Sequence, residues 1–491
     1  MEFKKGERRE QVILFPESLE EYVEENSTVR VIDAYVNSNN LSDHGFNRWQ
    51  PNETGRPPYD PKDILKLYIY GYLNRIRSSR RLETESKRNV EVMWLLGKLS
   101  PDHKTIARFR SDNPEALKNM FRDFVKMCAK FELYGKELAS IDGSKFKAVN
   151  SKKRNFTQGI VKDRLERLDK KINEYFKELD ENDRKEDDID KTKTKEDIKK
   201  IIEELKERKI TYQKHAEELK GNGETQKSLT DPESRLMPSN GKMDVCYNIQ
   251  TAVDAKNKLI IGFEVTNHTN DMNQITPMAE QIKDVLEVET IAITGDKGYA
   301  SVSDIAAAIQ IGVDPHIAGT DYDICIPSQE DKSGEITNQT NGKCVYLKDR
   351  NIVLCPMGNI LYPNSYNRKN SAALFYNLTA CRNCACRCST RKKGQMHQVT
   401  MHESAFSKTF SDKDLSVKQI HIKPDSKIYK QRKSIAEHPF GTVKNSMDGR
   451  YCLTKGKRKV TGEFALLFMA YNLKRVINIL GSKKILQLMN R

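Results

Sequence analysis

The sequence predicts an α/β protein in which helices flank a mixed sheet, with an all-helical region before the sheet and two insertions within it. Apolar residues recur at helical spacing through the first 130 residues, and they alternate at strand spacing between residues 245 and 265. A highly charged stretch, 161–220, and a cysteine-rich stretch, 322–415, interrupt this pattern. A chain of 491 residues is long enough for roughly two to four domains.

The first region, residues 1–130, is predicted to be helical and to bind DNA. The stretch "DPKDILKLYIYGYLNRI" (60–76) places one apolar stripe at spacings of three and four, and residues 89–113 predict a helix, a turn and a second helix. On that second helix we expect a basic outer face, like that of a DNA-recognition helix, made of His103, Lys104, Arg108 and Arg110. The basic cluster 75–81 strengthens this prediction. The alternative is a helical domain whose basic face contacts no DNA.

The strand pattern starts near a short apolar run that ends at Asp142. Two alternating segments, "CYNIQTAVD" and "LIIGFEV", are joined by "AKNK" and predict an antiparallel hairpin. A helix (271–286), a short buried strand that stops at Gly295 and Asp296, and another helix (301–312) follow. We therefore expect the sheet domain to begin in 131–160 and 221–321 and to be completed by its C-terminal part.

That C-terminal part, residues 416–491, holds much of the positive charge. The chain carries a formal charge of +15, and this segment alone has 17 Lys and Arg against 4 Asp and Glu. Such a surface most often binds nucleic acid, because phosphate contacts release counterions; the alternative is an effect on solubility alone. The N-terminus lacks the apolar core of a signal peptide, and no apolar run approaches a membrane span, so we expect a cytoplasmic protein.

The charged insertion, 161–220, predicts an antiparallel coiled-coil hairpin. Its apolar residues follow two series with spacings of three and four, from Val161 to Leu179 and from Ile198 to Leu219. It holds 18 cations and 19 acids, so it adds little attraction for phosphate. We interpret it as a protein-contact or spacer arm; a plain exposed hairpin is the alternative.

The second insertion, 322–415, contains seven of the ten cysteines and predicts a zinc ribbon. "CPMG" at 355 and "CRNCACRC" at 381–388 resemble its two ligand-bearing turns, although Cys355 has no partner three residues away. The predicted ligands of one structural zinc are Cys355, Cys381, Cys384 and either Cys386 or Cys388, of which we favour Cys388. Free thiols are the alternative.

Three acids carry the predicted chemistry. Asp142 and Asp296 both follow apolar strands, where a sheet holds carboxylates rigidly, and Glu437 lies in "YKQRKSIAEHPFGTVK" (429–444) among cations and aromatics. Phosphoryl transfer with two metal ions needs acidic oxygens that converge on hard cations. A strand-end Asp is also a common turn or cap residue, so neither aspartate decides the matter alone.

Together these residues resemble the DDE transposases of bacterial insertion sequences. The motifs "IDGSKF", "GDKGYAS" and "EHPFGTVK" are similar to that family's three acidic motifs, and "PPYDPKDILKLYIYGYLNRIRSSRRLE" is similar to its helical leader. The resemblance implies an RNase H-like core and two Mg2+ (or Mn2+) ions held by Asp142, Asp296 and Glu437. The family signature usually has three residues between its Arg and Glu, whereas Arg432 and Glu437 have four between them. Pro439 is expected to kink or restart the helix that carries Glu437.

The resemblance also implies a DNA partner. The protein is expected to bind the terminal inverted repeats of its element, to cleave them and to join the 3′ hydroxyl to target DNA, acting as a homodimer in the DNA complex. The implied DNA contacts are Lys145, Lys147, Lys152, Lys153, Arg154, Tyr429, Arg432 and Lys444. A nuclease that does not join strands and a catalytically lapsed DNA-binding protein are the alternatives. Should Glu437 face away, the rival acids are Asp254, Asp271 and Glu463, with Asp271 more simply a helix cap.

Overall fold

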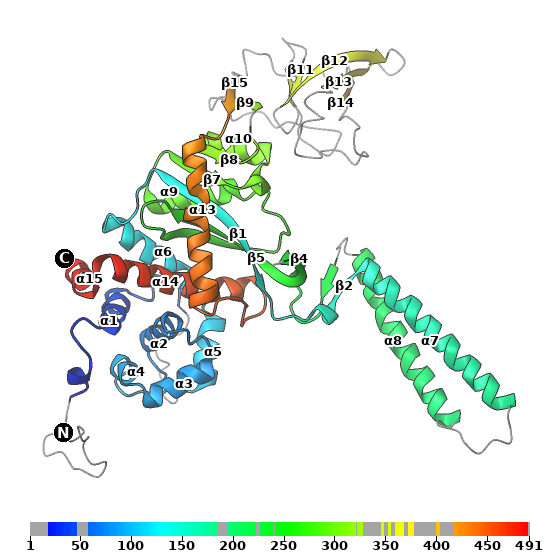
Figure 1. Cartoon of the computed structure of the whole chain (residues 1–491), viewed down its shortest axis with the longest axis horizontal. Coiled ribbons are helices and arrows are strands. Elements are labelled where there is room, and N and C mark those ends of the chain that lie inside the picture. The colour runs from blue at the N-terminus through cyan, green and yellow to red at the C-terminus, as the bar shows by residue number, and fades with distance from the viewer. Residues whose placement is uncertain are drawn as a thin grey trace, which may run out of the picture.

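The computed structural model describes residues 18–46, 57–184, 195–221, 226–239, 241–320 and 417–489, together with the shorter segments 322–327, 345–347, 352–354, 359–367, 372–377 and 399–402 (Figure 1). It is an α/β protein with a mixed central sheet, flanking helices and a helical N-terminal region, so the predicted fold class is confirmed. The coiled-coil hairpin projects away from the sheet, and the strands of the second insertion lie beyond the sheet's other end.

The N-terminal region is a series of short helices. They are η1 (Leu19–Tyr22), α1 (Thr28–Ser38), α2 (Pro61–Leu73), α3 (Ser79–Arg88), α4 (Val90–Leu95), α5 (His103–Asp112) and α6 (Pro114–Lys130). Asp60 caps α2, which begins with a proline, and Asp102 caps α5 by accepting hydrogen bonds from two backbone amides. These caps fix where α2 and α5 begin.

One prediction for α5 is wrong, because Arg110 does not face outward. Its side chain is buried, its guanidinium lies over the ring of Tyr68, and it donates a hydrogen bond of 2.9 Å to the hydroxyl of Tyr72. A long aliphatic stem and a planar head allow an arginine to pack among aromatic rings, which a pattern of charges does not reveal.

The central sheet has the strand order β4-β5-β1-β7-β8, and β6 also pairs with β5. Its strands are β1 (Leu138–Lys147), β4 (Arg235–Ser239), β5 (Lys242–Asp254), β6 (Ile260–Thr266), β7 (Ile291–Gly295) and β8 (Val313–Ile317). β1 is antiparallel to β5, whereas β7 and β8 run parallel to β1. β5 and β6 form the hairpin that the alternating pattern predicts.

Helices pack on this sheet and complete its core. They are α9 (Ile275–Leu286), α10 (Val302–Gln310), α13 (Ser426–Gly441), α14 (Lys457–Leu480) and α15 (Ser482–Met489), with the short turns η3 (Lys297–Tyr299) and η4 (Thr442–Ser446, π-helical). α13 crosses the sheet over β1, β5 and β7 (Figure 1). α14 is buried along most of its length and contacts α2, α6 and β6, so the N-terminal helices and the sheet share one hydrophobic core.

The charged insertion consists of two long helices, α7 (Gln158–Arg184) and α8 (Lys195–Gly221), packed against one another. A short strand pair, β2 (Asn155–Thr157) and β3 (Gln226–Ser228), joins the hairpin to the sheet domain. A small separate core at its base contains Phe156, Val161 and Leu219. The coiled-coil insertion named in the predicted fold class is therefore present.

The second insertion is flanked by two strands, β9 (Tyr322–Pro327) and β15 (Val417–Ile422), which pair with each other. Between them lie β10 (Val345–Leu347), β11 (Ile352–Leu354), β12 (Ile360–Asn367), β13 (Ala372–Tyr376) and β14 (Val399–His402), which form an antiparallel sheet. The predicted zinc ligands Cys355, Cys381, Cys384, Cys386 and Cys388 lie outside the described residues.

In the described part of the chain, no single helix has the length and apolar character needed to cross a membrane. α14 and α15 meet that requirement only when taken together, and they are bent by 103° at the break between them.

Candidate active site

Asp142 and Asp296 are brought together by the parallel pairing of β1 with β7. The register pairs Leu138 with Ala292 and Ser140 with Thr294. If this register is continued by two residues, Asp142 of β1 comes opposite Asp296, which lies just beyond the end of β7. Because neighbouring strands lie about 4.8 Å apart, two carboxylates that share a register position are close neighbours. The sheet therefore holds Asp142 within β1 and Asp296 directly after the neighbouring strand β7. The expectation that Asp142 lies at a strand end is wrong, because pairing with β5 continues β1 to Lys147.

The environment of Asp142 is unfavourable for its negative charge. Burial raises its pKa to about 6; Arg432 opposes this shift, whereas Asp296 and Asp271 add to it. The backbone amide of Gly143 donates a hydrogen bond of 3.0 Å to one carboxylate oxygen. These influences place three carboxylates and one guanidinium in a single electrostatic cluster. A cation beside Asp142 would stabilise its charged form.

Asp296 is held differently. It is only partly buried and serves as the N-cap of η3, accepting a hydrogen bond of 2.7 Å from the backbone amide of Gly298. One carboxylate oxygen is thereby fixed by its own loop. A short cap of this kind sets the direction of the side chain.

The third predicted acid lies on α13, which Asp425 caps. Ile435, Ala436, Pro439 and Phe440 form the buried face of this helix, and Glu437 is exposed. The helix runs through Pro439 to Gly441 and then continues as the π-helical turn η4, so the proline does not end it. A widened turn is one way in which a helix accommodates irregular hydrogen bonding.

Glu437 is not gathered with the two aspartates in this structure. Among the described residues, no three His, Cys, Asp or Glu side chains are placed so that they could hold a metal ion together. On the same helix Arg432 is half-buried, and its charge acts on Asp142. Tyr429 is also half-buried. The role of Glu437 as a third ligand stays a prediction.

Two of the predicted DNA-binding lysines have partners within the protein. Lys145 pairs with Asp271 at 3.3 Å. Lys444, on η4, donates a hydrogen bond of 2.6 Å to the hydroxyl of Ser144, and its ammonium lies 4.6 Å from the centre of the Phe146 ring. Burial lowers the pKa of Lys444. Both lysines thus help to attach the surroundings of the acids to β1.

The remaining predicted cations lie farther along the chain. Lys147 is exposed and lies 4.0 Å from Asp244. Lys152, Lys153 and Arg154 form the short turn η2, and all three are exposed; Arg154 reaches the hydroxyl of Thr230 at 3.5 Å. This turn and Lys147 are the exposed members of the predicted basic set.

The three rival acids, Glu463, Asp254 and Asp271, lie in different surroundings. Glu463 is fully buried and pairs with Arg77 at 2.5 Å, and Asp254 holds a turn by accepting hydrogen bonds from backbone amides. Asp271, in contrast, lies among the site residues, and the expectation that it is a helix cap is wrong because Gln274 is the N-cap of α9. Asp271 was named as a rival acid but interpreted as a cap, because its contacts with β1 and β5 depend on the fold; the polar residues Asn248 and Gln250 within an apolar strand were the available signal.

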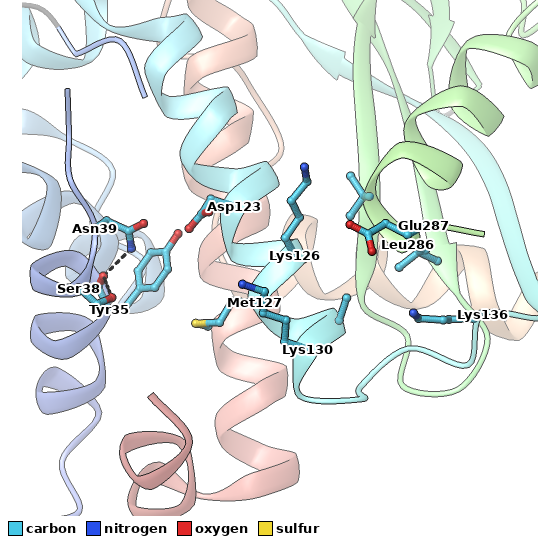
Figure 2. A pocket seen from close by; sticks show the side chains of 12 residues that line it. Tyr35, Ser38, Asn39, Asp123, Lys126, Met127, Lys130, Lys136, Leu286 and Glu287 are labelled. Carbon is cyan, nitrogen blue, oxygen red and sulfur yellow. Dashed lines mark hydrogen bonds between the residues drawn. The ribbon is translucent and has the colours of Figure 1, made fainter. Parts of the chain in front are cut away.

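A separate cavity of about 460 Å³ lies near the opposite ends of these strands, where β1 and β7 begin (Figure 2). α1, α6 and the end of α9 contribute to its lining, which includes Tyr35, Asp123, Lys126, Lys130 and Glu287. Asp142 and Asp296 do not line it. This cavity is therefore not part of the acidic site.

The mixed sheet, with Asp142 within β1 and Asp296 just after β7, is typical of a class of enzymes that act on phosphodiesters with acidic residues. A family model described as a transposase DDE domain matches residues 223–473, just over half of the chain, and one described as a transposase domain matches residues 17–112. The chain therefore belongs to the DDE transposase family and is a DDE-type transposase, an enzyme of a mobile element. Members of this family generally use divalent metal ions. Asp296 and Glu437 lie inside the larger match, and Asp142 lies between the two matches.

The comparison with curated proteins gives no match. Among solved structures, the chain is similar to the piggyBac transposase in its synaptic complex with hairpin DNA, with a TM-score of 0.30 and 10% sequence identity. The matched region covers 94% of this chain and 79% of that chain.

Proposed function

We propose that this transposase binds the ends of its own insertion sequence, cleaves the DNA by two-metal-ion hydrolysis and joins the freed 3′ hydroxyl to target DNA. The observation that supports this most directly is the parallel register of β1 and β7, which leads to Asp142 and Asp296 on adjacent strands. Arg432 from α13 adds a positive charge to the same cluster. A DNA phosphate near this cluster would meet both metal-binding acids and a guanidinium.

The donor set fits a hard divalent cation. Carboxylate oxygens are the ligands that Mg2+ and Mn2+ prefer, and the poorly solvated charge of Asp142 would be stabilised by such an ion. We propose that Asp142 and Asp296 hold the ions and that Glu437, exposed on α13, supplies a third carboxylate. Two ions, when bound, activate the attacking oxygen and stabilise the leaving oxygen.

For the DNA backbone we propose a path over the exposed turn η2. Lys152, Lys153 and Arg154 would contact phosphates there, with Lys147 nearby. Closer to the acids, the proposed contacts are Lys145, Tyr429, Arg432 and Lys444. Flexible cations suit contacts with phosphate that do not depend on base sequence.

Two further parts of the proposal concern assembly. Two element ends have to be processed, so we propose a homodimer in the DNA complex, bound to the terminal inverted repeats and to target DNA. We also propose one structural zinc ion, held by Cys355, Cys381, Cys384 and Cys388.

Replacing Asp142 by Asn tests the catalytic part of the proposal. The substitution removes a negative ligand and keeps the size of the side chain, so cleavage of a labelled element end in Mg2+ should fall by orders of magnitude. DNA affinity should hold or rise, because a charge that repels phosphate is lost. Asp284→Asn, at an exposed acid on α9, is the matched control and should cleave like the parent.

Replacing Lys152, Lys153 and Arg154 together by Gln should have the reverse effect. Binding should weaken, and its dependence on salt should become shallower by roughly one phosphate contact per cation that engages DNA. If Asp142→Asn cut as well as the parent, the acid would be no more than a counter-ion for its neighbouring lysines. Cleavage by the parent without transfer of the 3′ end to a target plasmid would indicate a nuclease.

A further inference from the structure

A buried network of hydrogen bonds connects the two chain segments that carry Asp142 and Asp296. At its centre, one carboxylate oxygen of Asp271 accepts hydrogen bonds from the side-chain amides of Asn248 at 2.7 Å and Gln250 at 2.6 Å. The ammonium group of Lys145 lies 3.3 Å from the same oxygen. On the other side, the amide oxygen of Gln250 accepts a hydrogen bond from the hydroxyl of Tyr299.

The direction of each hydrogen bond in this network is fixed. Asn248, Gln250 and Tyr299 have no exposed surface, so their polar groups depend on partners within the protein. Burial raises the pKa of Tyr299 far above its usual value, so its hydroxyl keeps its proton and donates. Gln250 must then accept through its oxygen and donate through its nitrogen to the carboxylate of Asp271. The bridge therefore runs from Tyr299 through Gln250 to Asp271.

The first end of the bridge lies against β1 immediately after Asp142. The bridge can lie this close to β1 because residue 143 is a glycine. A Cβ atom on residue 143 would come within 3.0 Å of the side chains of both Asp271 and Gln250. Lys145, two residues farther along β1, pairs with Asp271 directly. The strand is therefore in contact with the bridge on both sides of Ser144.

The second end of the bridge lies in the turn that follows Asp296. Tyr299 is the last residue of η3, and Asp296 is the cap of the same turn. The hydroxyl of Tyr299 thus fixes the far end of a turn whose near end is fixed by the carboxylate of Asp296. A change at Tyr299 would be passed to Asp296 through only two intervening residues.

We infer that Asp271, Gln250 and Tyr299 are positioning residues that hold the chain segments of Asp142 and Asp296 at the separation required for shared metal ions. The inference rests on the proposed function, in which these two aspartates bind the metal. Hydrogen-bond partners behind metal ligands commonly set ligand orientation, and their loss lowers metal affinity or activity by roughly 10–100-fold. In this chain the partners act through the backbone on both ligands at once.

Three substitutions test the bridge in the full-length protein, with Mg2+ titrated in the cleavage assay and Mn2+ binding measured by isothermal titration calorimetry in the absence of DNA. Tyr299→Phe removes only the hydroxyl, and Asp271→Ala removes the acceptor; both should raise the Mg2+ concentration for half-maximal cleavage by roughly 10–100-fold, with a smaller effect on the rate at saturating Mg2+. Asp271→Asn keeps an oxygen that accepts from Asn248 and Gln250, so most of the Mg2+ affinity should return. A residue that bound metal through its charge would not be rescued by Asn.

Tyr247→Phe is the matched control. Tyr247 is also a fully buried tyrosine, and its hydroxyl donates to the carboxylate of Asp231 at 2.7 Å, outside the bridge. This variant should lose stability comparably and keep the parental Mg2+ requirement. Asp142→Asn in the same assay reports on the proposed function alone.

Each outcome decides the inference. An unchanged Mg2+ requirement in Tyr299→Phe and Asp271→Ala, while Asp142→Asn abolishes cleavage, would overturn the bridge and leave the proposed function standing. Equal damage from Asp271→Asn and Asp271→Ala would also overturn it, because the charge of Asp271 would then be the active feature. Parental cleavage by Asp142→Asn would instead refute the metal site itself.

Discussion

At the scale of single residues, Arg77 shows that a member of a basic cluster can be buried inside the protein. It lies within the stretch 75–81 that favoured DNA binding, yet its side chain is buried and pairs with Glu463. Glu463 also accepts hydrogen bonds from the backbone amides of Leu453 and Thr454. The pair therefore joins the segment between α2 and α3 to α14, and Glu463 also holds the loop before α14.

Replacing Arg77 by Met should destabilise the protein strongly. Removal of one partner leaves the Glu463 charge buried without its cation, which typically lowers the free energy of unfolding by about 3–5 kcal/mol. The measurement is urea denaturation followed by circular dichroism.

Arg122→Met is the control for this prediction. Arg122 pairs with Asp284 on the surface, and about half of each side chain is exposed, so its loss should lower the free energy of unfolding by less than about 1 kcal/mol. Similar losses in the two variants would show that the buried ion pair contributes no more than a surface pair.

The sequence could predict residues whose position follows from local pattern. Asp142 and Asp296 were found because each follows a short apolar run, which is a local feature. Asp271 was misinterpreted because 126 residues separate it from Lys145, and only strand pairing brings them together. Arg110 was placed outside because charge alone does not tell whether an arginine stacks on buried rings.

At the scale of elements, the spacing of apolar residues predicted most of the helices and strands that depend on residues close together in the sequence. The paired helices α7 and α8 and the hairpin β5–β6 follow directly from apolar spacing. The parallel pairing of β1 with β7, and the attachment of the π-helical turn after Pro439 to Ser144 through Lys444, join segments that are distant in the sequence. These features lie beyond the reach of a pattern read along a single chain.

The cysteine-rich insertion yields a prediction at the same scale. Purified protein should contain one zinc ion per chain, and Cys381→Ser with Cys384→Ser should remove it, because thiolates supply its ligands. Elemental analysis measures the content, and X-ray absorption should give Zn–S distances near ~2.3 Å.

Cys246→Ser is the control for the zinc prediction. This thiol is buried in β5, where burial raises its pKa, and its loss should leave the metal content unchanged. Protein that lacks stoichiometric zinc and keeps its fold in chelator would show the cluster to be ordinary thiols.

At the scale of the whole molecule, α14 connects parts that the sequence separates. It lies between the N-terminal helices and the sheet (Figure 1), and it contacts α2, α5, α6 and β6. Phe464 and Phe468 pack edge-on against Phe146 of β1 and Phe263 of β6. The predicted boundary at residue 130 therefore crosses a continuous core rather than dividing two cores.

A fragment of residues 18–130 should not fold alone. Without α14, the apolar faces of α2 and α6 that it covers would be exposed to water, at about 25 cal/mol per Å² of apolar surface. Addition of a peptide spanning residues 457–489 should restore helical circular dichroism and dispersed amide signals in NMR spectra. A fragment that shows dispersed signals without the peptide would contradict this prediction.

The position of α14 has a consequence for how the protein is made. A ribosome completes α2 and α6 long before it reaches α14, the helix that covers them. The N-terminal helices of a nascent chain therefore keep apolar surface exposed until α14 has been translated. We expect chains that stop before residue 457 to leave this surface uncovered and to be removed by chaperones and proteases.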